Sequence, residues 1–259
     1  MAARTRGYGA QQVSRAAARD VGFFARPRIR AFLSRYFYFC MALLMGGLAL
    51  LAFSRTADAR LLHARPPRPL LLWLHAAAFS AWIVLFIVQS ALVRVRKVSV
   101  HRALGWLGAG LAATMVVSGF IVSVVMLRFD MTVLHLKNVA PFLAILWCDM
   151  IIFGACMTLA IYFRKRPEYH RRLVFMASCQ LAQATFVRFD YIGYHDLYYP
   201  ALDLLIMAGI LRDLVVEGRI NRVYVYVFPA IIALQALASY LEHVNPSWWK
   251  ATTLAILGS

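Results

Sequence analysis

Seven apolar runs, separated by short polar or basic segments, dominate the chain. Most are long enough to cross the roughly 30 Å hydrocarbon core of a bilayer as an α-helix. The shortest run also contains Gln180 and Gln183, and we regard it as the weakest span. The pattern predicts an all-α fold, a polytopic integral membrane helical bundle of about seven transmembrane helices. The runs cover residues 36–54, 70–93, 103–126, 139–163, 173–189, 198–216 and 222–241.

The pattern divides the chain into three parts. Residues 1–35 form a basic N-terminal arm, which we expect to be amphipathic or partly disordered, and residues 36–241 form the seven-helix transmembrane domain. Residues 242–259 form a short C-terminal tail whose apolar piece is too short to span a bilayer. The arm is rich in Arg and poor in acids, as in mitochondrial targeting segments, but we favour a basic arm lying on the membrane surface.

Composition supports a bilayer as the solvent. The 259 residues are 62% hydrophobic and only 15% charged, whereas a soluble domain is about a quarter charged. The net charge of +17 would suggest nucleic acid in a soluble protein. Here the basic residues lie between apolar runs, so we expect membrane lipids and other membrane protein subunits as partners, and no nucleic acid. The four cysteines lie inside apolar runs without a CxxC pair, and we interpret them as packing residues.

The basic residues also predict an orientation. If the N-terminus is on the inner side, residues 1–35, 94–102, 164–172 and 212–222 are inner segments. They hold 20 of the 28 Lys and Arg residues, as the positive-inside rule requires. Segment 55–69 departs from this rule, because it carries four arginines on the expected outer side. We expect a bacterial inner membrane, with the mitochondrial inner membrane as the alternative, and a C-terminus opposite the N-terminus.

Four histidines alternate between the two expected membrane faces. His75 and His135 fall on the outer side, and His101 and His170 fall on the inner side. A b-type haem held by two histidines needs one from each of two neighbouring helices at the same depth. This arrangement resembles cytochrome b561, a transmembrane two-haem electron carrier whose four central helices supply the ligands in this order. The resemblance implies haem b, bound first by His101 with His170 and then by His75 with His135.

Arginines follow both inner histidines. Arg102, Arg171 and Arg172 are expected to contact haem propionates or lipid phosphates. The working function is therefore a membrane-embedded electron-transfer protein, or an accessory subunit of a membrane redox complex.

A second resemblance covers roughly residues 35–220. The segments LHAAAFSAWIVLFIVQSALV, HRALGWLGAGLA and RPEYHRRLVFMA resemble a family of uncharacterised bacterial multi-helix membrane proteins. That family carries a His-Arg-x-Leu-Gly turn and a Pro-Glu-x-His-Arg-Arg-Leu turn. It implies a fold but no agreed activity, and His135 does not belong to its pattern. The positions that match are His75, Trp82, Gln89, His101, Arg102, Gly105, Pro167, Glu168, His170 and Arg171.

Two alternatives remain open. One is a non-catalytic structural membrane subunit without a cofactor, for which the basic arm and the aromatic segment 189–199 would be lipid or partner surfaces. The other is an intramembrane zinc-dependent hydrolase of the ceramidase and adiponectin-receptor type, with a metal site in the spans. Its candidate ligands are His75, Asp149, His195 and Asp203. In that family the last helix carries two histidines four residues apart, and no apolar run of this sequence has such a pair. No catalytic residue is assigned.

Overall fold

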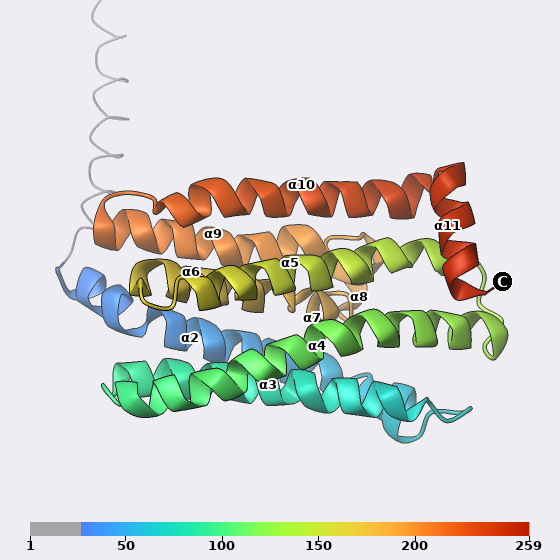
Figure 1. Cartoon of the computed structure of the whole chain (residues 1–259), viewed down its shortest axis with the longest axis horizontal. Coiled ribbons are helices and arrows are strands. Elements are labelled where there is room, and N and C mark those ends of the chain that lie inside the picture. Colours follow the sequence, from blue (N-terminus) through green and yellow to red (C-terminus); the bar gives the residue numbers. More distant parts are fainter. Residues whose placement is uncertain (1–26, 259) are drawn as a thin grey trace, which may run out of the picture.

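The computed structural model describes residues 27–258, and all regular structure in that range is helical. Most of the helices run along one axis in a bundle, and one short helix crosses its end (Figure 1). The elements are α2 Pro27–Ser54, η1 Asp58–Leu62, α3 Leu70–Arg94, α4 Val98–Thr132, η2 Ala140–Phe142, α5 Leu143–Tyr162, α6 Pro167–Gln180, α7 Gln183–Phe186, α8 Asp190–Tyr194, α9 Tyr198–Glu217, α10 Arg222–Val244 and α11 Ser247–Leu257.

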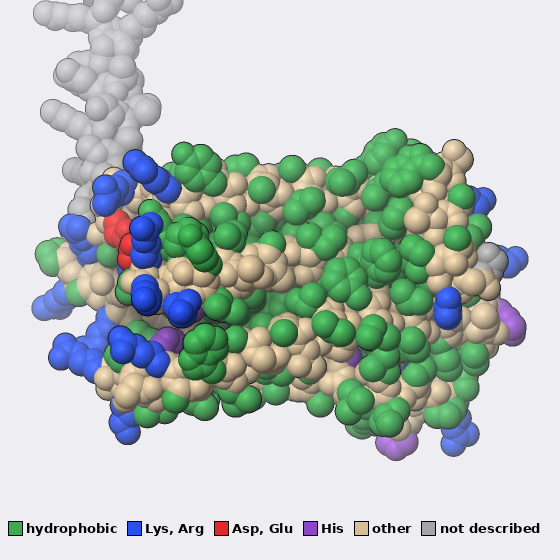
Figure 2. Space-filling view, viewed as in Figure 1, with side chains coloured by type: hydrophobic (Ala, Val, Ile, Leu, Met, Phe, Trp, Pro, Cys, Tyr) green, Lys and Arg blue, Asp and Glu red, His purple; other side chains and the backbone are tan. Residues whose placement is uncertain are grey.

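Five helices are long and apolar enough to cross a membrane: α2, α3, α4, the continuous segment Ala140–Tyr162, and α10. This confirms a helical bundle of the membrane type. Large apolar side chains cover the flanks of the bundle (Figure 2). Many Lys and Arg side chains lie at one end of the bundle, which we call the basic end (Figure 2). At this end α2, α4, α6 and α10 begin, and α3, α5 and α9 end (Figure 1).

The run 173–189 is not one helix, which corrects the prediction. α6 begins earlier, at Pro167, and ends at Gln180; after a two-residue turn the chain continues as the short helices α7 and α8. Gln180 and Gln183 at this break are both buried. The side-chain amide of Gln180 bonds to side chains of two neighbouring helices, as described below.

The sixth run forms one helix, α9, with nearly the predicted bounds, but it is not among the five apolar spans. It carries Asp203, Arg212, Asp213 and Glu217. Asp213 and Arg212 are buried, so charged groups of α9 face the bundle rather than water. α9 packs against α2, α6 and α7.

The two ends of the chain also differ from the expectation. α2 begins at Pro27, so the last part of the expected basic arm belongs to a helix, while residues 1–26 lie outside the described range. The C-terminal tail forms α11, which packs against η2 and the end of α4. Arg128 Nη2 donates to the carbonyl oxygen of Ile256 at 2.6 Å and ties α11 to α4.

The core lies between α5, α6, α9 and α10. α5 and α6 supply the most deeply buried side chains, among them Phe153, Phe175 and Met176. Three of the four cysteines, Cys148, Cys156 and Cys179, are buried and free, in agreement with a packing role, whereas Cys40 is exposed. α3 lies at the edge, and Trp82 is its one residue buried within the described chain. The basic end of this core holds the candidate site.

Candidate functional site

Two similar turns place a histidine at the start of a helix. Arg96, in the left-handed region at φ 60°, turns the chain between α3 and α4, and Pro167 occupies the first turn of α6. His101 is the fourth residue of α4, and its backbone N–H bonds to the carbonyl of Lys97. His170 is likewise the fourth residue of α6. Both α4 and α6 pack on α5, so both histidines lie beside the same helix.

The two imidazole rings face each other across a short gap. The ring centroids of His101 and His170 are 6.3 Å apart, and the ring planes are inclined by 82°. Both side chains are half-buried. The sequence-based expectation that these two histidines lie together is therefore met in space, and Figure 2 shows histidine surface among the Lys and Arg side chains of the basic end.

The hydrogen bonds of the rings leave nitrogen lone pairs free. His170 Nδ1 lies 2.9 Å from the carbonyl oxygen of Ala160. When Nδ1–H donates to that carbonyl, Nε2 carries the lone pair, which is the usual state of a metal-ligating histidine. His101 Nδ1 is buried without a hydrogen-bond partner among the described residues. The two rings together therefore offer two nitrogen donors at one place.

The spacing also suits axial ligation. Two histidines that held a haem iron between them would each contribute one ring nitrogen, with a metal–nitrogen bond of roughly 2 Å. The observed separation is 6.3 Å. The residues present therefore fit a bis-histidine group such as haem b. The backbone carbonyl of His101 accepts from Gln89 Nε2 at 3.2 Å, which fixes the first turn of α4 against α3.

The three arginines expected to contact propionates or lipid phosphates differ in their exposure, and the expected lipid contact is wrong for Arg172. Arg102 is exposed beside His101. Arg172 is fully buried and cannot face a lipid phosphate: Nε and Nη2 each bond to a carboxylate oxygen of Asp213 at 2.7 Å. Arg171 is partly exposed, and its Nη2 donates to Glu217 at 2.8 Å. The sequence missed these bonds because the partners lie more than 40 residues away on α9.

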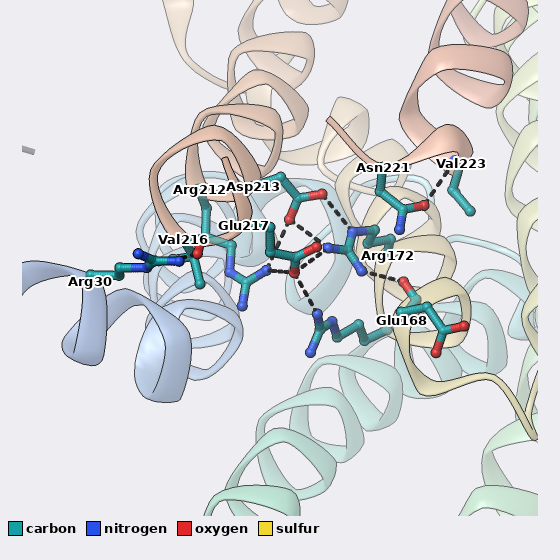
Figure 3. Close-up of polar contacts among 10 residues, drawn as sticks. Arg30, Glu168, Arg172, Arg212, Asp213, Val216, Glu217, Asn221 and Val223 are labelled. Carbon is teal, nitrogen blue, oxygen red and sulfur yellow. Dashed lines mark hydrogen bonds and ion pairs between the residues drawn. The ribbon is translucent and has the colours of Figure 1, made fainter. Parts of the chain in front are cut away.

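Arg171 and Arg172 belong to an ion cluster with charged residues of α9 (Figure 3). Arg212 Nη1 bonds to Asp213 at 2.9 Å and to Glu217 at 2.7 Å. Three guanidinium groups thus share two carboxylates, so the cluster keeps one excess positive charge. The Arg171 and Arg212 guanidinium groups also lie 5.8 Å and 5.6 Å from the ring centre of Tyr38. The cluster joins α2, α6 and α9 at the basic end.

The outer histidine pair has no comparable arrangement. His75 lies on α3, stacked on Phe79, with Nδ1 3.5 Å from the hydroxyl of Ser118 on α4. His135 is exposed in the loop after α4, in the left-handed region at φ 53°. The expectation of one histidine on each of four consecutive helices therefore fails at His135, because α4 ends before it and α5 begins after it.

The four candidate zinc ligands are not brought together. Within residues 27–258, no group of three or more His, Cys, Asp or Glu side chains is arranged to hold a metal ion. Asp149 is buried and accepts from Gln180, Asp203 accepts from Gln235, and His195 is exposed between Tyr191 and Tyr194. Asp149 and Asp203 thus bond to different amide partners, and the four residues do not converge on one site.

The motif residues of the bacterial family have packing roles. Trp82 is buried, donates from Nε1 to the Ser178 hydroxyl at 3.3 Å, and packs edge-on against Phe153. The Glu168 carbonyl accepts from Arg172 Nη1. A Cβ atom at Gly105 would meet the Gln89 amide at ordinary contact distance. These contacts hold α3, α4, α5 and α6 together around the two histidines.

No protein-family model, no curated protein and no solved structure matches the chain. The two family resemblances of the sequence therefore stay predictions, and the functional argument depends on the site alone.

Proposed function

We propose that the chain is a membrane-embedded electron-transfer protein, or the electron-transfer subunit of a larger membrane complex, that binds b-type haem between His101 and His170. The observation that carries the proposal is the 6.3 Å separation of two imidazoles, one of which has a buried nitrogen without a partner. Such a haem would supply a one-electron carrier whose potential depends on its ligands and burial.

The chain's own residues define what the site would do. The carbonyl of Ala160 orients His170 through Nδ1, and Gln89 holds the first turn that carries His101. Both ligands lie at helix N-termini, where the positive end of the helix dipole favours the anionic propionates. Arg102, exposed beside His101, adds a positive charge for the same groups.

We further propose that the bundle crosses the bilayer seven times, with α9 and the segment 167–189 completing the five apolar spans. The parallel arrangement of α6 and α9 with the other long helices supports this proposal (Figure 1). Their charged groups face the interior, where Arg and carboxylate partners neutralise them. The basic end then lies on the cytoplasmic or matrix side, as the positive-inside rule predicts.

Absorption spectroscopy tests the haem proposal. The protein, expressed with a haem precursor and purified in detergent, should give a dithionite-reduced minus oxidised spectrum with Soret and α-band changes. His101→Ala and His170→Ala should each remove the six-coordinate low-spin signal. His195→Ala is the matched control, because His195 is exposed and lies outside the basic end. His75→Ala then asks whether a second haem is bound on the outer side.

A chain without any haem signal would overturn the proposal. Copurification with other membrane subunits in that case would favour the structural-subunit alternative. Retention of the full signal in both His101→Ala and His170→Ala would show that the haem, if bound, uses other ligands.

A further inference from the structure

A chain of hydrogen-bonded polar side chains crosses the middle of the apolar bundle. Asp149 on α5 accepts from Gln180 Nε2 at 2.7 Å and from the Tyr199 hydroxyl at 3.1 Å. Gln235 Nε2 donates to Gln180 Oε1 and to Asp203 Oδ1, each at 3.3 Å. Four helices thus meet at one polar network: α5, α6, α9 and α10.

The network is deeply buried. Asp149 is 5% exposed, Gln235 is 3% exposed and Gln180 is fully covered. Next to it, where α6 breaks, Gln183 is also buried and its Nε2 has no hydrogen-bond partner within the described residues. Polar groups at this depth are expensive, and in membrane proteins they are a reason to look for function.

No cation of residues 27–258 neutralises Asp149. The groups that bond to it or lie near it are Gln180 on α6, Tyr198 and Tyr199 on α9, and Cys148 on its own helix. In the described part of the chain, Gln235 on α10 and Asp203 on α9 are connected to it only through Gln180. Within residues 27–258, Asp149 forms no ion pair with Lys, Arg or His, whereas Asp213 is paired with two arginines. A buried carboxyl without a counter-ion avoids the cost of its charge by binding a proton. Both neighbouring donors bond to Oδ1, so Oδ2 is the oxygen left for the proton.

A series of titratable groups lies between this carboxyl and the end opposite the basic one. Within the described residues no hydrogen bond joins the Tyr198 and Tyr199 hydroxyls, so a transfer between the two rings must cross this gap. The Tyr198 hydroxyl, next in sequence to Tyr199 with ring centroids 5.0 Å apart, donates to Glu242 Oε2 at 3.0 Å. Glu242 lies 3.7 Å from His243 Nδ1, and His243 Nε2 lies 3.1 Å from Asp196. His243 and Asp196 are about half exposed, so the path opens to the surface.

We propose that Asp149 is a proton-binding site reached from this end of the bundle through Glu242, Tyr198 and Tyr199. A proton that enters at Glu242 displaces the hydroxyl proton of Tyr198, which in turn is passed through Tyr199, and one proton arrives at the Asp149 carboxylate. Each tyrosine keeps one proton, so the transfer is balanced. The site uses neither His101 nor His170, and it therefore stands independently of the haem proposal.

Infrared difference spectroscopy on the full chain in lipid nanodiscs provides the test. At neutral pH, wild type should show a protonated carboxyl C=O band that Asp149→Asn removes and Asp149→Glu shifts. After a change from H₂O to D₂O, Tyr198→Phe and Glu242→Gln should keep the band but slow its deuterium shift, each on the order of tenfold or more, because each removes a proton-transfer group. Tyr226→Phe, at an exposed tyrosine, should leave the rate unchanged.

Two results would overturn the inference. One is a protonated carboxyl band that neither Asp149 variant alters. The other is an unchanged exchange rate in both Tyr198→Phe and Glu242→Gln, which would mean that Asp149 is a structural hydrogen-bond acceptor only. If Asp149→Asn does not fold, the shifted band of Asp149→Glu and the exchange rates of the two path variants still decide between these outcomes.

Discussion

Arg172 and Asp213 form a bidentate ion pair in which both side chains are completely buried, with Nε–Oδ2 and Nη2–Oδ1 distances of 2.7 Å. The pair joins α6 to α9 across the interior of the basic end (Figure 3). In an apolar interior, removal of one partner lowers the free energy of unfolding by more than the intact pair contributes to it. The reason is that the other charge is left buried without a neutralising group.

Asp213→Ala should therefore lower the free energy of unfolding by about 3–5 kcal/mol. The measurement is reversible unfolding in mixed micelles, followed by circular dichroism. Asp58→Ala is the matched control. Asp58 pairs with His63, both side chains are mostly exposed, and the expected change is below about 1 kcal/mol. Equal effects of the two substitutions would contradict a buried ion pair.

Close packing between α9, α6 and α10 depends on Gly209. A Cβ atom there would collide with the Tyr224 hydroxyl and with the ring of Phe175. Gly209→Val should destabilise the protein by about 1–3 kcal/mol, since a larger group must displace buried aromatic side chains. Gly47→Val is the control, because an added Cβ atom at Gly47 meets nothing within 4 Å. Thermal unfolding in detergent compares the two, and a smaller loss at Gly209 than at Gly47 would refute the packing argument.

Trp82 connects the edge helix α3 to the core. Its indole N–H donates to Ser178, and its ring packs on Phe153. Trp82→Phe removes the hydrogen bond and part of the ring, and should cost about 1–2 kcal/mol. Trp106→Phe should change little, because Trp106 is 65% exposed. The prediction is checked by chemical unfolding monitored by circular dichroism, and indistinguishable midpoints for the two variants would contradict it.

The proposed seven crossings place the turns after α3, α5 and α9 on one side of the membrane. Single cysteines at Arg96, Lys165 and Arg219 (Arg96→Cys, Lys165→Cys and Arg219→Cys) should therefore react with a membrane-impermeant maleimide from the same side, and His135→Cys from the other. Cys40 is replaced by Ser in each variant because it is exposed. Labelling of Arg219→Cys from the side of His135→Cys would show that one of the two segments between Lys165 and Arg219, either 167–189 or α9, does not cross the bilayer.

The sequence alone determined the class of fold and most helix positions. An apolar run of sufficient length is a local property, and it predicts a helix in lipid whatever the neighbouring helices are. The basic turns likewise predicted that His101 and His170 share one end, because helices of known number alternate in direction. The local pattern did not predict the break within 173–189. There α6 ends at Gln180, whose side chain bonds to Asp149 on α5 and to Gln235 on α10.

Only the tertiary structure decided which side chains meet. The 6.3 Å gap between His101 and His170 depends on how α4 and α6 pack on α5. The partners of Arg172 and Asp149 lie 31 to 50 residues away in the chain. A buried charge or amide must find a partner wherever packing places one, and that pairing depends on the rotation and depth of whole helices. The sequence therefore predicted a helical bundle and a common end for His101 and His170, whereas packing determined the ion cluster, the helix break and the buried carboxyl.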